Sequence, residues 1–143
     1  YVTLDFNDAP ATFTKNRMLV EAVRIPHSGW PMRMMDVENI AWRITLNDNS
    51  TVLHLGDADP RDNHFVIDAE YWDERPPNIA FPPYWFLSTT AGRDILDNRI
   101  KPQRSVGIHV PDTISADPIR RPPELRGHDI FITPGETRSI PTN

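Results

Sequence analysis

The stretch "TVLHLGDAD" (51–59) decides how this chain folds, because an apolar, β-favouring run ends there on a Gly-Asp step. Val52, Leu53 and Leu55 are typical of a buried strand. No Lys, Ser or second Gly stands directly behind the step. The sequence therefore predicts a strand that ends by presenting the carboxylate of Asp57, and it raises the question of what that carboxylate meets.

A hairpin is predicted around this strand. Residues 37–46 ("VENIAWRITL") alternate between two faces, and "NDNS" (47–50) provides the turn into 51–55. Further strands are expected at 17–27, 78–81 and 105–110, with a last strand pair in 130–140. Helices are expected before Pro76 and across 84–100, which ends before Pro102. This succession predicts a layered α/β (α+β) fold built as a single unit over residues 1–143.

The composition narrows the classes of function. The net charge of −5 argues against non-specific electrostatic binding to nucleic acid or to an anionic membrane. The chain has no cysteine, which excludes disulfides, thiolate nucleophiles and Cys-ligated zinc, so any metal depends on His and carboxylates. No apolar run approaches the roughly 20 residues of a membrane span and no signal-peptide pattern opens the chain, so a soluble protein is expected, with its compartment unknown. The start at Tyr1 without Met predicts a piece of something longer.

Three expected strand ends carry possible metal ligands. They are His27 in "RIPHSG", Asp57 in "LHLGDAD" and His109 in "VGIHVP". Strand ends meet at one edge of a sheet in layered α/β folds, where sites are commonly built. Taken singly, each residue fits a capped loop, or a histidine bonded to a backbone carbonyl, about as well as it fits a ligand.

The sequence around these three residues resembles the metallo-β-lactamase superfamily, in particular its lactonase-like branch of metal-dependent hydrolases. The resemblance runs from about Val20 to about Val110 and includes the order His27, Asp57, His109 and the hairpin "NIAWRITL…TVLHLGD". It implies the C-terminal αβ half of an αββα sandwich. It also implies that His27 binds one metal ion, His109 binds the other and Asp57 bridges both as the catalytic carboxylate.

The same resemblance implies hydrolysis of a small-molecule substrate by metal-activated water, with two zinc ions or with Mn or Fe in their place. The family's HxHxDH pattern is missing here, since no His precedes His27. We therefore expect the chain alone to be inactive and to pair with an N-terminal half, or with copies of itself, that covers an exposed sheet. The alternative is a non-catalytic half-fold that serves as an interaction or structural module and binds no metal.

Other residues near these strand ends each have a structural and a functional interpretation. His54 lies on the opposite strand face from Asp57, as a packed core histidine or a residue supporting the site, and Asp59 either orients a ligand or is a solvated turn residue. Trp30 and the neighbouring methionines suit an apolar substrate rim or ordinary packing. Tyr84 suits a hydrogen-bond donor to substrate or a rigid turn that opens a helix. His64 and His128 lie in polar segments and are expected at the surface.

Overall fold

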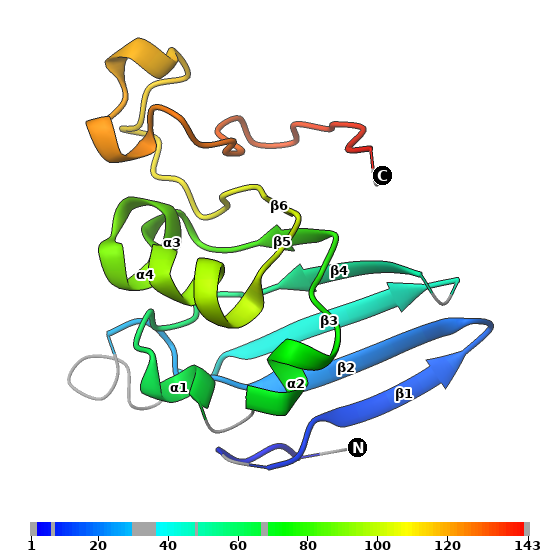
Figure 1. Ribbon diagram of the computed structural model, residues 1–143. Coiled ribbons are helices and arrows are strands. Elements are labelled where there is room, and N and C mark those ends of the chain that lie inside the picture. The colour runs from blue at the N-terminus through cyan, green and yellow to red at the C-terminus, as the bar shows by residue number, and fades with distance from the viewer. Residues whose placement is uncertain (1–2, 7, 30–36, 48, 67–68, 142–143) are drawn as a thin grey trace.

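Six strands form one mixed sheet in the order β1-β2-β3-β4-β5-β6 (Figure 1). The computed structural model describes residues 3–6, 8–29, 37–47, 49–66 and 69–141. Strands β1 to β4 form an antiparallel meander, and β5 and β6 then add in parallel. The strands are β1 (Ala11–Lys15), β2 (Met18–Arg24), β3 (Ile40–Leu46), β4 (Ser50–His54), β5 (Ile79–Phe81) and β6 (Arg104–Ser105).

The α-helices lie in the connections between β4 and β6. They are α1 (Asn63–Val66), α2 (Ala69–Glu74), α3 (Tyr84–Ser88) and α4 (Thr90–Ile95), and α4 runs on into a π-helical turn at Leu96–Ile100. Short 3₁₀ turns at Pro118–Arg120 and Pro123–Leu125 follow β6, in a C-terminal segment that lies beyond the β6 edge of the sheet (Figure 1). The fold class is α+β, as the sequence predicts.

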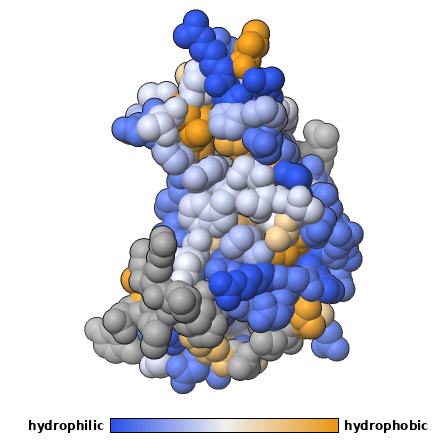
Figure 2. All heavy atoms as spheres, turned by 90° about the vertical axis from the view of Figure 1, so that its left-hand side faces the viewer, coloured by the Kyte–Doolittle hydropathy of each residue, from blue (hydrophilic) through white to orange (hydrophobic). Residues whose placement is uncertain are grey.

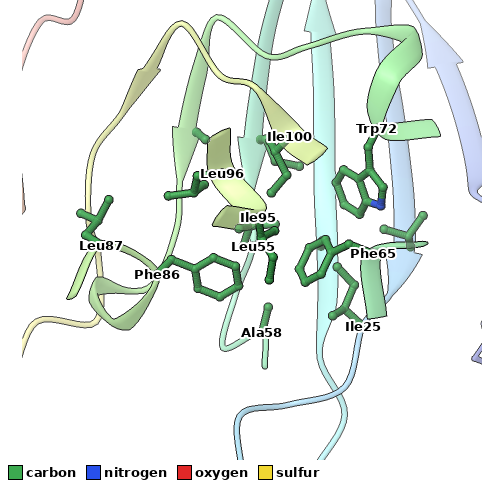
Figure 3. Close-up of a cluster of buried hydrophobic side chains, with 14 of the residues drawn as sticks. Ile25, Leu55, Ala58, Phe65, Trp72, Phe86, Leu87, Ile95, Leu96 and Ile100 are labelled. Atoms are coloured by element: carbon green, nitrogen blue, oxygen red, sulfur yellow. The ribbon is translucent and has the colours of Figure 1, made fainter. Parts of the chain in front are cut away.

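The hydrophobic core lies between the helices and one face of the sheet (Figure 3). Phe65 of α1 is at its centre, with its ring centroid 5.4 Å from that of Trp72 and 6.0 Å from that of Phe86. The sheet side contributes small or aliphatic groups such as Ala41, Leu53 and Leu55. Burying each large aromatic side chain stabilises the fold by about 2–3 kcal/mol.

A buried ion pair stands beside this core. Arg43 of β3 and Glu21 of β2 face each other in register, and the guanidinium donates to both carboxylate oxygens, at 2.8 and 2.9 Å. The same guanidinium lies over the ring of Tyr71 and donates to the Tyr71 carbonyl, which attaches α2 to the sheet. The pairing satisfies two charges that would be costly to bury alone.

The opposite face of the sheet carries a band of exposed apolar side chains. Phe13, Trp42 and Leu46 are 57%, 42% and 41% exposed. The registers Phe13↔Val20, Val20↔Ile44 and Ile44↔Val52 connect them across β1 to β4 through partly buried aliphatic residues. We call this band the open face. An apolar band across four strands exceeds the scattered apolar residues usual on a monomer surface.

Several expected elements differ from the structure. The helix across 84–100 is broken at Thr89, whose backbone is extended and whose side chain accepts a hydrogen bond from Gly92 N–H to begin α4. The strand expected at 105–110 is only two residues long, and the strand pair expected in 130–140 is wrong, because this segment contributes a single bridge between Gly107 and Ile130. Strand β1 was not expected from the sequence.

Candidate functional site

His27, Asp57 and His109 come together at one end of the sheet. His27 follows β2, Asp57 follows β4 and His109 follows β6, so three separate connections supply them. His27 Nε2 lies 3.4 Å from Asp57 Oδ2, and His109 Nε2 lies 3.3 Å from Asp57 Oδ1. The Asp57 carboxylate thus stands between two imidazoles, each facing its own oxygen. The side of the molecule toward which β2, β4 and β5 run is mostly hydrophilic or intermediate in character (Figure 2).

Backbone hydrogen bonds hold the His27 and Asp57 segments together. Ser28 N–H donates to the Asp57 carbonyl at 2.7 Å, and Asp59 N–H donates to the Pro26 carbonyl at 2.8 Å. These bonds form an isolated antiparallel bridge between His27 and Ala58, beyond the ends of β2 and β4. The relative position of the first two site residues is therefore set by the backbone and does not depend on their own side-chain contact.

Asn39 fixes the backbone of Asp57 from the other side. Its Oδ1 accepts a hydrogen bond from Asp57 N–H at 2.7 Å, and its Nδ2 donates to the Leu55 carbonyl at 3.1 Å. Gly56 lies between these two partners with φ +60, and a Cβ there would stand 2.1 Å from Asn39 Oδ1. The Gly-Asp step thus needs glycine for two reasons, the left-handed backbone and the close approach of the amide.

Trp85 connects the Asp57 segment to His109. Its indole Nε1–H donates to the Ala58 carbonyl at 2.9 Å, and its ring centroid lies 6.3 Å from that of His109, with the rings tilted by 30°. His109 has φ +54, a conformation uncommon outside glycine and often found at functional sites. Tyr84 N–H donates to the Ile108 carbonyl at 2.8 Å and holds the segment just before it.

The other residues that the sequence places near the site include His54 and Trp30. His54 is not a packed core histidine: it projects from the exposed face, because Leu53 and Leu55 take the buried side, and its Nδ1 accepts from Gly56 N–H at 3.0 Å. Partial burial lowers the pKa of His54, nearby His109 lowers it further and Asp57 opposes both. Trp30 and the methionines after it lie outside the described residues.

Asp59 is buried and is no solvated turn residue. Its carboxylate lies 3.2 Å from Arg61 Nε and 3.6 Å from His64 Nδ1. The expectation of a surface His64 is wrong, because its side chain is buried beside that carboxylate. Tyr84 is half-buried as the first residue of α3, which fits the turn interpretation.

The distances around Asp57 permit a test of the metal interpretation. His27 Nδ1 lies 2.8 Å from the Ser28 carbonyl oxygen, which can only accept, so the neutral ring holds its proton on Nδ1 and directs the bare Nε2 toward Asp57. Two ligands of one tetrahedral zinc ion, each about 2.0–2.1 Å from the metal, stand about 3.4 Å apart. The two imidazole–carboxylate distances match that spacing and exceed the roughly 2.7–2.9 Å of a charge-assisted hydrogen bond.

Within the described ranges, no group of three or more His, Asp or Glu side chains is arranged to hold a metal ion. His27 and His109 face different oxygens of Asp57, which gives each side of the carboxylate one imidazole. A catalytic zinc site generally takes about three protein ligands on one ion. Each imidazole faces a single carboxylate, that of Asp57, so the described residues supply fewer ligands than one such ion takes.

No protein-family model matches the chain, and no curated protein matches its sequence. None of the described helices is both long and apolar enough to cross a membrane.

Proposed function

We propose that this chain is the C-terminal portion of a metal-dependent hydrolase of the metallo-β-lactamase type, and that His27, Asp57 and His109 are its share of the metal ligands. The observation that carries the proposal is the Asp57 carboxylate between two imidazoles, at 3.3 and 3.4 Å. With the His27 Nδ1–H donating to the Ser28 carbonyl, Nε2 and the carboxylate oxygen would both be acceptors unless a cation or a proton lies between them. A divalent ion on each side of Asp57 would satisfy both contacts.

Zinc, or Mn or Fe in its place, would supply water of lowered pKa and polarisation of the scissile carbonyl or phosphoryl oxygen. The residues of this chain do the holding. The Asp57 carboxylate and the imidazoles of His27 and His109 would hold the ions. Asn39 and Trp85 keep the Asp57 segment in place through the hydrogen bonds to Asp57 N–H and to the Ala58 carbonyl.

The open face supports a second part of this proposal, a partner that covers the sheet. Trp42 on this face lies in register with His54, whose pKa responds to both His109 and Asp57. A partner αβ half packed on the open face would therefore extend to the end of the sheet that carries the three ligands, where the missing ligands are needed. A second copy of the chain is the other candidate for the same surface.

The proposal is tested by adding an N-terminal half that carries HxHxDH and measuring hydrolysis of a lactone, a thioester and a phosphodiester with zinc or manganese present. We expect the combination to hydrolyse one of these classes and Asp57→Asn to abolish the activity. Asp94→Asn, which changes an exposed carboxylate outside the site, should keep it. Full activity of Asp57→Asn, or no activity toward any class, would contradict the proposal.

The open face also favours the alternative, a metal-free interaction module, because an exposed apolar band can serve binding alone. In that case His27 or His109 would carry a proton toward Asp57, and zinc would have no effect on the NMR signals of the two imidazoles.

A further inference from the structure

A pocket lies away from the three site residues, between the π-helical turn, β6 and the segment 127–129. Its volume is about 610 Å³, within the range that small ligands fill. It opens beside Arg104 and Ser105, which make up β6, whereas His109 lies beyond the C-terminal end of this strand. The lining residues are Leu87, Arg93, Leu96, Asp97, Lys101, Pro102, Gln103, Arg104, Ser105, Gly127, His128 and Asp129.

One of the two acidic groups that line this pocket has its charge balanced by neighbouring arginines. Asp129 accepts hydrogen bonds from Arg104, at 2.6 Å, and from Arg138. Partial burial acts to raise the pKa of Asp129, but the two arginines outweigh it and hold that pKa below its ordinary value. Asp129 therefore stays ionised and has its charge balanced. Asp97 is the other carboxylate of the lining and is exposed to solvent.

Among the described residues, no carboxylate lies within ion-pair distance of Arg93 at the pocket. Its guanidinium donates to the Leu87 carbonyl at 3.0 Å and lies 3.4 Å from Thr90 Oγ1, and both oxygens are neutral. Burial lowers the pKa of His128, the nearby Arg93 lowers it further, and Asp97 acts in the opposite sense. The charge of Arg93 therefore acts on His128. The His128 ring is neutral, with one N–H, at neutral pH.

The donors around the pocket come from three different segments. Arg93 belongs to α4, Gln103 and Ser105 to β6 and the chain before it, and His128 to the C-terminal segment. A phosphate group has three terminal oxygens and close to two negative charges, so it can accept from donors on several sides. A carboxylate is planar with two oxygens and is satisfied by one arginine.

We propose that this pocket binds the phosphate group of a small molecule, with Arg93 as the charged anchor and His128, Ser105 and Gln103 as neutral donors. The inference is independent of the metal site and of any hydrolase activity, because none of these residues contacts His27, Asp57 or His109 in the described structure.

The test is an NMR titration of the full chain with inorganic phosphate, and separately with acetate, at pH 7.5 with a chelator and constant ionic strength. We expect saturable shifts of the backbone amides in 101–105 and 127–129 with phosphate, and at least about tenfold weaker binding of acetate, which is about 1.4 kcal/mol. Equal affinity for acetate would overturn the assignment to phosphate, and absence of saturation up to tens of millimolar would overturn the site.

Two variants and one control localise the binding. Arg93→Gln should weaken phosphate binding about tenfold or more, and Gln103→Glu should do the same by adding a negative charge at an exposed position, without disturbing the hydrogen bonds of Arg93. Arg120→Gln removes the same charge from an exposed site outside the pocket and should leave the affinity unchanged. Equal weakening in all three variants would show only a general charge effect, and would overturn the proposal.

Discussion

Replacing Gly56 by alanine tests how the Asp57 segment is held. Gly56 has φ +60, and the new Cβ would stand 2.1 Å from Asn39 Oδ1, so the amide must move and lose its hydrogen bonds to Asp57 N–H and the Leu55 carbonyl. The left-handed backbone costs an alanine about 1–2 kcal/mol. Each lost hydrogen bond costs about 1 kcal/mol. Gly56→Ala should therefore reduce the free energy of unfolding by about 3–4 kcal/mol.

Gly135→Ala is the matched control. Gly135 also has a left-handed backbone, with φ +76, but nothing lies within 4 Å of its added Cβ. Urea unfolding of this variant should show only the backbone cost, about 1–2 kcal/mol. Asn39→Ala combined with Gly56→Ala completes a double-mutant cycle, in which the second change should add little because the amide has already moved. Equal losses in Gly56→Ala and Gly135→Ala, or full additivity with Asn39→Ala, would refute the reasoning.

Two further predictions concern Trp85 and His64. Trp85→Phe removes the hydrogen bond to the Ala58 carbonyl, so we expect a loss of about 1 kcal/mol and a movement of the His109 imidazole NMR signals. Trp72→Phe, whose indole N–H has no hydrogen-bond partner among the described residues, should leave those signals in place; identical shifts in both variants would contradict this prediction. Burial lowers the pKa of His64 below its ordinary 6.5, with Asp59 partly opposing, so the unfolded chain takes up this proton first and stability falls as the pH drops below about 6.5. His64→Gln should thus lose less stability than the parent between pH 7.5 and 5.5, and an unchanged loss in urea unfolding at these two pH values would show that His64 is not responsible.

The convergence of His27, Asp57 and His109 could be predicted because each of these residues stands at the end of an expected strand. Each residue stands just past an apolar run, and the order of strands brings these ends to one side of a layered sheet. The local sequence thus indicates both which polar residues stand at the strand ends and that these ends lie close together. The role of the three residues as metal ligands came from the family resemblance, and it stays a prediction.

Other features depend on partners far away in the sequence. Asn39 reaches Asp57 N–H only through the β3–β4 register, and Trp85 reaches the Ala58 carbonyl from α3, so no local pattern marks either residue. His64 lies in a polar stretch, yet its side chain is buried in α1 beside the Asp59 carboxylate. The break of the long helix did carry a local signal, since Thr89 is a good helix N-cap.

The choice of the buried face of β3 is the clearest case of tertiary context. The apolar residues Trp42 and Leu46 alternate with Arg43, and periodicity alone would bury the apolar set. The structure buries Arg43 because Glu21 and Tyr71 receive its guanidinium on the helix side. Trp42 and Leu46 consequently form part of the open face, where we propose that a partner packs.

Zinc titration of the isolated chain, followed through the imidazole NMR signals, tests the central claim most directly. The account predicts weak binding that shifts the signals of His27 and His109 together, that Asp57→Asn abolishes, and that His128→Gln leaves unchanged. Binding is expected to be weak because each ion would have only one imidazole and one oxygen of Asp57 from this chain. Zinc that leaves the His27 and His109 signals unmoved, or binds equally to Asp57→Asn, would contradict the claim that these residues form a metal site.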